Sequence, residues 1–189
     1  MREASLMHHR VRDEFFANSE PSVCEWQRLR GAGVALHALC RPTMILVGNV
    51  VVDRPTGFSF AQEGDADGHR AFLIAMNDED GRWIDIAGWQ PAKSWTGLWL
   101  GAAWALGQAS VLQPRMRETG ALPVWRSPLN WLRAGREGIV LIRPTVAAYF
   151  LDDGGPLLAE DVDHAAELRR LMTRTGPRIF VRDRDRRAA

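Results

Sequence analysis

Carboxylates are the side chains of this sequence whose spacing comes closest to that of a catalytic or metal-binding site. Glu137 precedes an apolar run, and Asp161 and Asp163 follow later, separated by one residue. A two-metal phosphoryl-transfer site needs carboxylates that share cations. This order makes a small metal-dependent enzyme, acting on nucleic acid or phosphate esters, the alternative function for this chain. The competing interpretation is that Asp161 and Asp163 open a helix, cap it and complement its dipole.

Asp85 is the acidic residue best placed for acid–base chemistry. It lies between Ile84 and Ile86 in a strand-like run, on the face that also carries Trp83 and Trp89. A carboxylate among indole rings is poorly solvated and suits a general acid or base. The alternative is a solvent-facing strand position at which tryptophans cover the open side of a sheet.

Signatures of metals, cofactors and nucleophiles are lacking. Cys24, His37 and Cys40 do not have the paired spacing of a zinc site, and a single helix over 22–40 would hold the two cysteines apart. GAGVAL at 31–36 is not a dinucleotide-binding fingerprint, and neither a phosphate-binding loop nor G-x-S-x-G occurs. We therefore expect no metal and no cofactor, and the sequence favours a protein without catalytic activity.

Between residues 115 and 143 arginines are interleaved with Trp125 and Trp131, a pattern that suits nucleic-acid binding. Six arginines are accompanied there by two acidic residues, Glu118 and Glu137. Arginines beside aromatic rings suit phosphate contact combined with base stacking. The alternative is an ordinary surface, because the chain contains one lysine, Lys93, and uses arginine as its usual cation. The candidate residues for binding nucleic acid or another partner are Arg115, Arg117, Arg126, Arg133, Arg136, Arg143 and Trp89, the last at the end of a predicted hairpin.

The first part of the chain predicts a helix, several strands and a second helix. Ser22 and Glu25 have the spacing of a capping box at the start of an amphipathic helix over 22–40. TMILVGNVVV predicts a strand, and RAFLIAMN and RWIDIAGW flank the turn NDEDG as the arms of an antiparallel hairpin. The uncharged stretch 94–114 is apolar all round when drawn as a helix, which predicts a buried central helix carrying three of the eight tryptophans.

The second part predicts alternating helices and strands. Helices are expected over 127–135, 144–151 and about 159–173, with a strand over 138–142 and a further short strand at RIFV. The fold class that follows is α/β, with α and β elements mixed. It is a mixed sheet with an antiparallel hairpin, a buried central helix and further helices packed on the sheet. We expect one globular domain over 1–181 and a charged tail over 182–189.

The composition bounds the setting in which the protein works. The 189 residues carry a net charge of +1, so no overall field directs the chain to nucleic acid or a membrane. Two cysteines and a charged N-terminal segment without a secretory pattern predict a cytoplasmic protein. The stretch 94–114 contains polar residues and Pro114 and is too short to cross a bilayer, so we expect no membrane association.

Three segments resemble uncharacterised small proteins encoded by phages, prophages and mobile elements of proteobacteria. They are IDIAGWQPAKSWTGLWLGAAWALG, LPVWRSPLNWLRAGREGIVLI and LLAEDVDHAAELRRLM, which together span Ile84 to Met172. The resemblance implies an accessory role and carries over no catalytic residue. Combined with the arginine pattern, it predicts a non-enzymatic protein that binds a host protein complex, such as a defence system, or nucleic acid.

Overall fold

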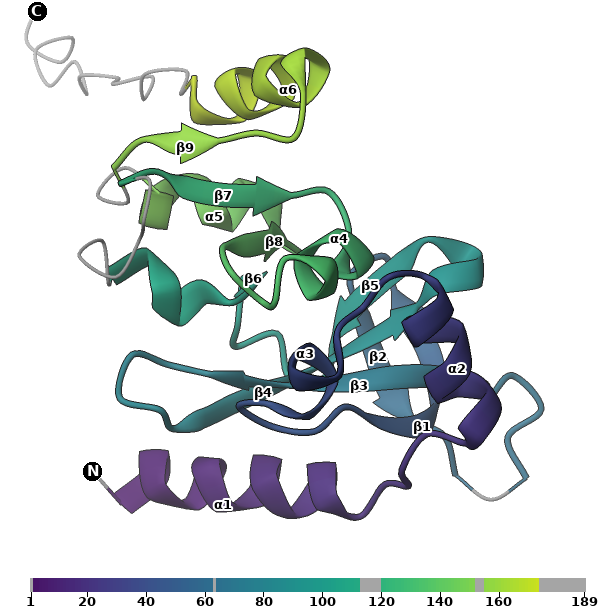
Figure 1. Ribbon diagram of the computed structural model, residues 1–189. Coiled ribbons are helices and arrows are strands. Elements are labelled where there is room, and N and C mark those ends of the chain that lie inside the picture. The colour runs from purple at the N-terminus through teal and green to yellow at the C-terminus, as the bar shows by residue number, and fades with distance from the viewer. Residues whose placement is uncertain (1, 63, 113–119, 152–154, 174–189) are drawn as a thin grey trace, which may run out of the picture.

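Five strands from the first part of the chain form a closed barrel (Figure 1). This computed structural model describes residues 2–62, 64–112, 120–151 and 155–173. The strand order around the barrel is β1-β2-β5-β4-β3, and β3 closes the ring against β1. Neighbouring strands are antiparallel except for β2 and β5, which run parallel. The strands are β1 (Leu46–Arg54), β2 (Gly57–Phe60), β3 (His69–Asn77), β4 (Trp83–Gln90) and β5 (Trp95–Leu98).

Three helices precede the barrel strands and cover the barrel. The helix α1 lies along the lower side of the barrel in Figure 1 and adds the buried Val11 and Phe15 to the cluster that contains Phe58 and Leu73. Gly88 pairs with Leu73 and leaves room for the Phe58 ring, which a Cβ at this position would approach to 3.0 Å. The helices are α1 (Arg2–Phe16), α2 (Val23–Gly31) and α3 (Leu36–Cys40).

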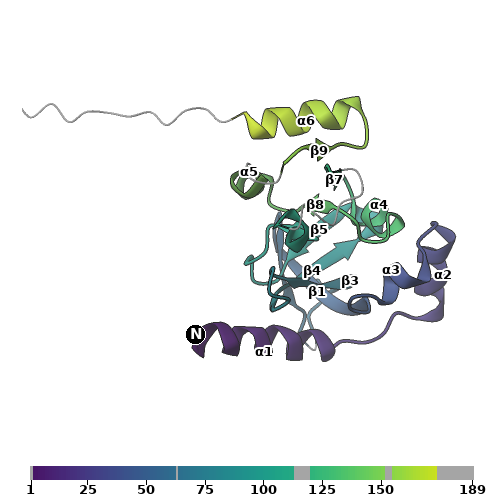
Figure 2. The ribbon, with the colours of Figure 1, turned by 60° about the vertical axis from the view of Figure 1, so that its left-hand side comes forward.

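The rest of the described chain forms a second lobe, which lies above the barrel in Figure 2. Its sheet has the order β6-β8-β7-β9, in which β6 is antiparallel to β8 and β7 is parallel to both β8 and β9. Trp104, Ile139 and Leu168 belong to the buried cluster of this lobe. Its elements are β6 (Ala105–Leu106), η2 (Gln108–Leu112), β7 (Leu122–Trp125), α4 (Pro128–Arg133), β8 (Ile139–Leu141), α5 (Pro144–Leu151), β9 (Leu157–Leu158) and α6 (Val162–Met172). The short 3-10 turn η1 (Pro91–Lys93) belongs to the barrel, where it connects β4 to β5.

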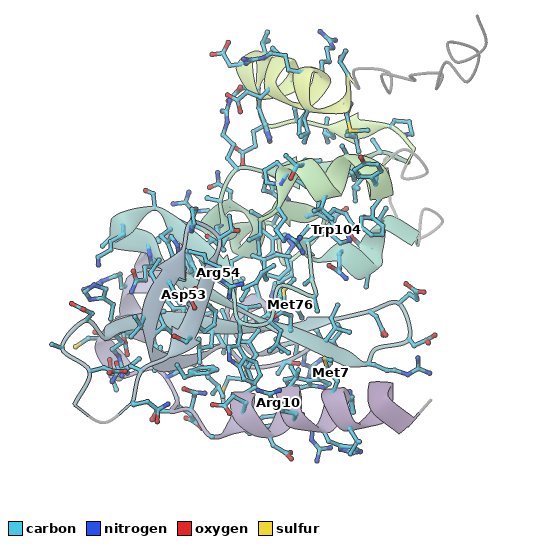
Figure 3. The ribbon with its side chains drawn as sticks, turned by 180° about the vertical axis from the view of Figure 1, so that it is seen from behind. Met7, Arg10, Asp53, Arg54, Met76 and Trp104 are labelled. Atoms are coloured by element: carbon cyan, nitrogen blue, oxygen red, sulfur yellow. The ribbon has the colours of Figure 1, made fainter. Side chains whose placement is uncertain are left out.

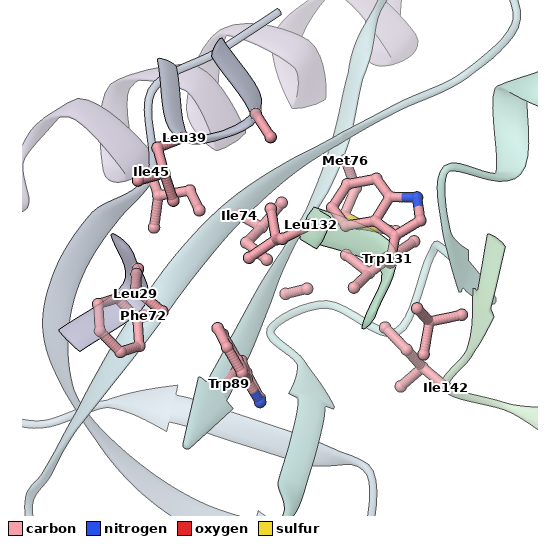
Figure 4. Close-up of a cluster of buried hydrophobic side chains, with 14 of the residues drawn as sticks. Leu29, Leu39, Ile45, Phe72, Ile74, Met76, Trp89, Trp131, Leu132 and Ile142 are labelled. Carbon is pink, nitrogen blue, oxygen red and sulfur yellow. The ribbon is translucent and has the colours of Figure 1, made fainter. Parts of the chain in front are cut away.

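The largest apolar cluster joins the barrel to the second lobe (Figure 4). Phe72, Ile74 and Trp89 contribute from the outer face of the barrel, and Trp131 and Leu132 contribute from α4. Residues of α2 and α3 complete the cluster at its edge. The two parts therefore share one core, because neither the outer face of β3 and β4 nor α4 buries its apolar side chains by itself.

The mixed α and β class is confirmed, but the predicted central helix over 94–114 is wrong. This stretch forms β5, a connecting segment, β6 and η2. Gly101 and Gly107 have positive φ angles of 71° and 69°, which a helix does not contain. An apolar run without polar spacing does not distinguish a buried helix from buried strands. No helix in the described ranges is long and apolar enough to cross a membrane.

Two further predictions differ in detail from the structure. The helix over 22–40 is divided into α2 and α3 by Gly33, which has a φ of 87°. The predicted hairpin is confirmed as β3 and β4, but a register shift beside Met76 changes the face of its last pairs. Trp83 therefore packs with the cluster that contains Phe58 and Leu73, whereas Asp85 stays on the face that carries Trp89. The RIFV strand and the tail over 182–189 lie outside the described residues.

Gly138 offers a test of how closely β7 and β8 pack. Its φ is 79°, and an added Cβ would meet the carbonyl oxygen of Pro123. We expect Gly138→Ala to lower the free energy of unfolding by more than about 2 kcal/mol, because the left-handed backbone and the contact both oppose a side chain. Gly31→Ala is the control, since a Cβ there meets nothing within 4 Å. Urea unfolding of both variants checks this, and equal stability of the two would contradict it.

Candidate functional site

Asp85 holds a segment of backbone and does not face a cleft. Its side chain is fully buried, and its two carboxylate oxygens accept backbone N–H groups from Ile86, Leu100, Ala102 and Ala103 at 2.7 to 3.1 Å. These four donors satisfy the hydrogen-bonding capacity of a carboxylate that is cut off from water. The expectation of a solvent-facing position is therefore wrong, and the contacts give Asp85 a structural role in place of the acid–base role.

The other three candidate carboxylates lie in the second lobe, two at the start of α6 and one before β8. The Asp161 side chain accepts the His164 N–H at 2.7 Å as the N-cap of α6, and Asp163 is exposed in the first turn of that helix. Glu137 is exposed in the turn before β8. No group of three or more His, Cys, Asp or Glu side chains with the arrangement of a metal site occurs in the part of the chain that the structure describes. The carboxylates of α6 thus act as cap and first-turn residues.

The described arginines between 115 and 143 connect elements and do not form one charged face. Arg126 pairs with the carboxylates of Asp161 and Glu167, at 2.5 and 3.3 Å. Burial lowers the pKa of Arg136 to about 10, so its guanidinium is still charged at neutral pH. Arg115 and Arg117 lie outside the described residues. The backbone carbonyl acceptors are Ala32 for Arg133, Ala38 and Thr43 for Arg136, and Gly101 for Arg143.

The tryptophans of the apolar stretch are structural, and Trp89 is buried instead of exposed. Trp89 is 3% exposed and lies 5.5 Å from Phe72 between ring centroids (Figure 4). Trp104 stacks on Phe150 at 5.2 Å in the second lobe. Trp89 is therefore not the exposed ring that the sequence suggested, but it lines a groove between the barrel and α4.

This groove consists of two adjoining cavities of about 320 and 380 Å³, and Pro91 lines both of them. We call it the basic groove. It runs from α2 across the turn between β4 and β5 to the start of α4. Its polar lining residues are Glu25, Arg28, His69, Arg70, Gln90 and Lys93 in the first cavity and Ser94, Thr96, Arg126 and Ser127 in the second.

Glu25 is the one carboxylate that lines the basic groove, and it is already paired with Arg70. Arg70 donates from Nε at 2.6 Å and from Nη2 at 3.0 Å. The same carboxylate accepts the N–H and the hydroxyl of Ser22, which completes the predicted capping box of α2. The hydrogen bond from Arg70 lowers the pKa of Glu25 to about 2, with a smaller contribution from Ser22. Glu25 therefore stays ionised and paired with Arg70 over the neutral and mildly acidic range, and the two charges balance each other.

Arg28 and Lys93 supply the unpaired cations of the groove. Both are exposed, and no ion pair joins either of them to an acidic residue in the described ranges. Arg28 lies one helical turn after Glu25 on α2, and Lys93 ends the turn η1. His69 at the start of β3 lines the same cavity. Charges that are not matched within the protein are available to a ligand.

Gln90 lines the first cavity with an unsatisfied polar atom. The residue is 5% exposed, and its Nε2 donates to the Arg70 carbonyl at 3.3 Å. Its Oε1 is buried and has no hydrogen-bond partner among the described residues. An unpaired buried carbonyl costs about 1–3 kcal/mol. Gln90 thus brings an unsatisfied polar atom to the wall of the first cavity.

Arg28, Gln90 and Lys93 were missed by the sequence analysis. Arg28 and Lys93 stand outside the arginine-rich stretch, and they come together only because the barrel brings α2 next to the turn after β4. A polar residue at the end of the apolar run IDIAGWQ was the one available signal for Gln90. The groove offers cations, hydroxyls and an amide oxygen, which are groups that bind phosphates and nucleobases.

Comparisons of the chain with protein-family models, with curated proteins and with solved structures found no match. The function is therefore inferred from the geometry and charge of the groove.

The ion pair that borders the groove predicts a specific pH dependence of stability. The pKa of Glu25 falls from 4.5 to about 2 on folding, so the pair stabilises the protein above pH 4.5 and this contribution is lost as the pH falls toward 2. We expect Glu25→Gln to be less stable than the parent by about 1 kcal/mol at pH 7, since the pair is partly exposed to solvent. The difference should shrink below pH 4.5.

Urea unfolding at several pH values measures this difference. Glu20→Gln is the matched control, because Glu20 is exposed and outside the groove. A stability difference for Glu25→Gln that does not change with pH would contradict the pairing.

Proposed function

We propose that the protein is a non-catalytic binding protein that holds single-stranded nucleic acid in the basic groove. The observation that carries this proposal is the charge of the groove lining. Its one carboxylate, Glu25, is paired with Arg70, while Arg28 and Lys93 remain unpaired. Such a lining attracts the phosphate backbone, which supplies most of the affinity in non-specific binding.

The shape of the groove favours a single strand over a duplex. A protein that reads duplex DNA inserts a helix or a β-ribbon into the major groove. Here the unpaired cations, Arg28 and Lys93, line a cavity of about 320 Å³, and a second cavity of about 380 Å³ that shares Pro91 with it lengthens the path for an extended strand. Ser94 and Thr96 in the lining add polar side chains that suit contacts with sugar and phosphate. We place this activity in the cytoplasm, as expected for an accessory protein of a phage or mobile element.

The groove also differs from the surface expected from the sequence. Arg133, Arg136 and Arg143 donate to backbone carbonyls between elements, so their replacement disturbs the fold as well as any binding. Variants of these residues therefore do not separate binding from stability. Arg28 and Lys93 do, because their side chains are exposed.

Fluorescence anisotropy with a labelled mixed-sequence oligodeoxynucleotide of about 15 nucleotides tests the proposal. We expect Arg28→Glu and Lys93→Glu each to weaken binding about tenfold, since each removes a phosphate contact and adds a repulsive charge. The logarithm of the binding constant should fall with the logarithm of salt concentration with a slope of about −1 to −2, for two or three contacts.

Arg169→Glu is the matched control, because it makes the same charge change at an exposed position of α6 outside the groove. It should bind like the parent protein. Equal affinity of Arg28→Glu, Lys93→Glu and the parent would refute the proposal, and so would an equal loss in Arg169→Glu.

A further inference from the structure

A second polar cavity, of about 340 Å³, lies where the barrel meets the second lobe. It is separate from the basic groove and shares no lining residue with it. Two arginines from different parts of the fold line it: Arg54 ends β1 of the barrel, and Arg143 follows β8 of the second lobe. Figure 3 shows Arg54 and the neighbouring Asp53 on the side of the barrel that faces this lobe.

The Arg143 guanidinium is held in place by the backbone that it contacts. Its Nη1 donates to the Gly101 carbonyl at 2.5 Å, and its backbone N–H donates to the Trp104 carbonyl at 3.0 Å. No carboxylate of the described residues forms an ion pair with Arg143. A fixed guanidinium directs its remaining N–H groups to one position, which favours an oxyanion there.

Arg54 reaches the same cavity from the turn between β1 and β2. Its Nε donates to Asp53 at 3.0 Å, which leaves the Nη1 and Nη2 ends of the guanidinium for another acceptor. The side chain lies over Gly57, where an added Cβ would come within 2.6 Å of Nε. Thr56 also lines the cavity, and no carboxylate of the described residues lines it.

We propose that this cavity binds a phosphate group, either inorganic phosphate or the terminal phosphate of a larger molecule. Two guanidinium groups without an acidic residue in the lining match a small, highly charged oxyanion. The apolar part of the lining is limited to Leu98 and Leu100, and Leu98 is 1% exposed, so little surface remains for a base or another apolar group. The site is independent of nucleic-acid binding in the basic groove.

Thermal unfolding in phosphate tests this site. A ligand that contacts Arg54 and Arg143 bridges the barrel and the second lobe and stabilises only the folded protein. Relative to sodium chloride of equal ionic strength, phosphate at about ten times its Kd should raise the unfolding midpoint by about 3 °C. Arg54→Ala should abolish this rise, and the exposed Arg54 side chain can be removed without opening the core.

Two further variants separate the site from a general effect of charge. Arg30→Ala removes an exposed arginine of α2 outside the cavity and should keep the full rise. Gly57→Ala should lose the rise while it keeps both arginines, because the new methyl group displaces the Arg54 guanidinium. Arg143 is left unchanged, since its bond to Gly101 supports the fold.

The source of the phosphate is distinguished by comparing an oligonucleotide that carries a 5′-phosphate with the same oligonucleotide ending in a 5′-hydroxyl. Binding that is tighter with the 5′-phosphate, and loses this advantage in Arg54→Ala, identifies a nucleic-acid end as the ligand. A rise with inorganic phosphate alone identifies the free ion. The proposal is overturned when neither response depends on Arg54, whether or not Arg28→Glu and Lys93→Glu weaken binding in the basic groove.

Discussion

The buried carboxylate of Asp85 accepts four backbone N–H groups, and three of them come from the segment that leaves the barrel toward the second lobe. This segment has no helical or strand partners for those amides, and buried amides without acceptors are costly. Asp85 therefore fixes where the chain enters the second lobe. Trp104 follows directly, and its carbonyl accepts the N–H groups of Ile142 and Arg143. The position of Arg143, and with it the proposed phosphate site, depends on this arrangement.

Two arginines connect the second lobe to the helical segment that precedes the barrel. Arg133 and Arg136 on the second lobe donate to carbonyls of the segment that contains α2 and α3, and the apolar cluster around Trp131 fills the space between them. Cations that are used in this way are fixed and partly desolvated, so they contribute little to a mobile charged surface. Among the cations that line the basic groove, Arg28 and Lys93 have no ion-pair partner within the described residues and are left for a ligand.

Local signals in the sequence predicted the elements whose boundaries depend on local chemistry. The capping box of Ser22 and Glu25, the hairpin turn at Gly81 and the Ser127 cap of α4 were all confirmed. The stretch 94–114 was mispredicted because an apolar run does not distinguish a buried helix from buried strands, and one of its strands, β6, pairs with the distant β8. The groove could not be predicted for the same reason, since Arg28 and Lys93 are far apart in the chain.

Amide hydrogen exchange of the folded protein tests the central claim, that Asp85 holds the segment between β5 and β6. The amides of Leu100, Ala102 and Ala103 should exchange at rates close to those of the barrel strands, although they lie outside regular secondary structure. Gly101 is an internal reference, because its amide donates to no acceptor in the described part of the chain and should exchange much faster. Rapid exchange at all four positions would contradict the claim.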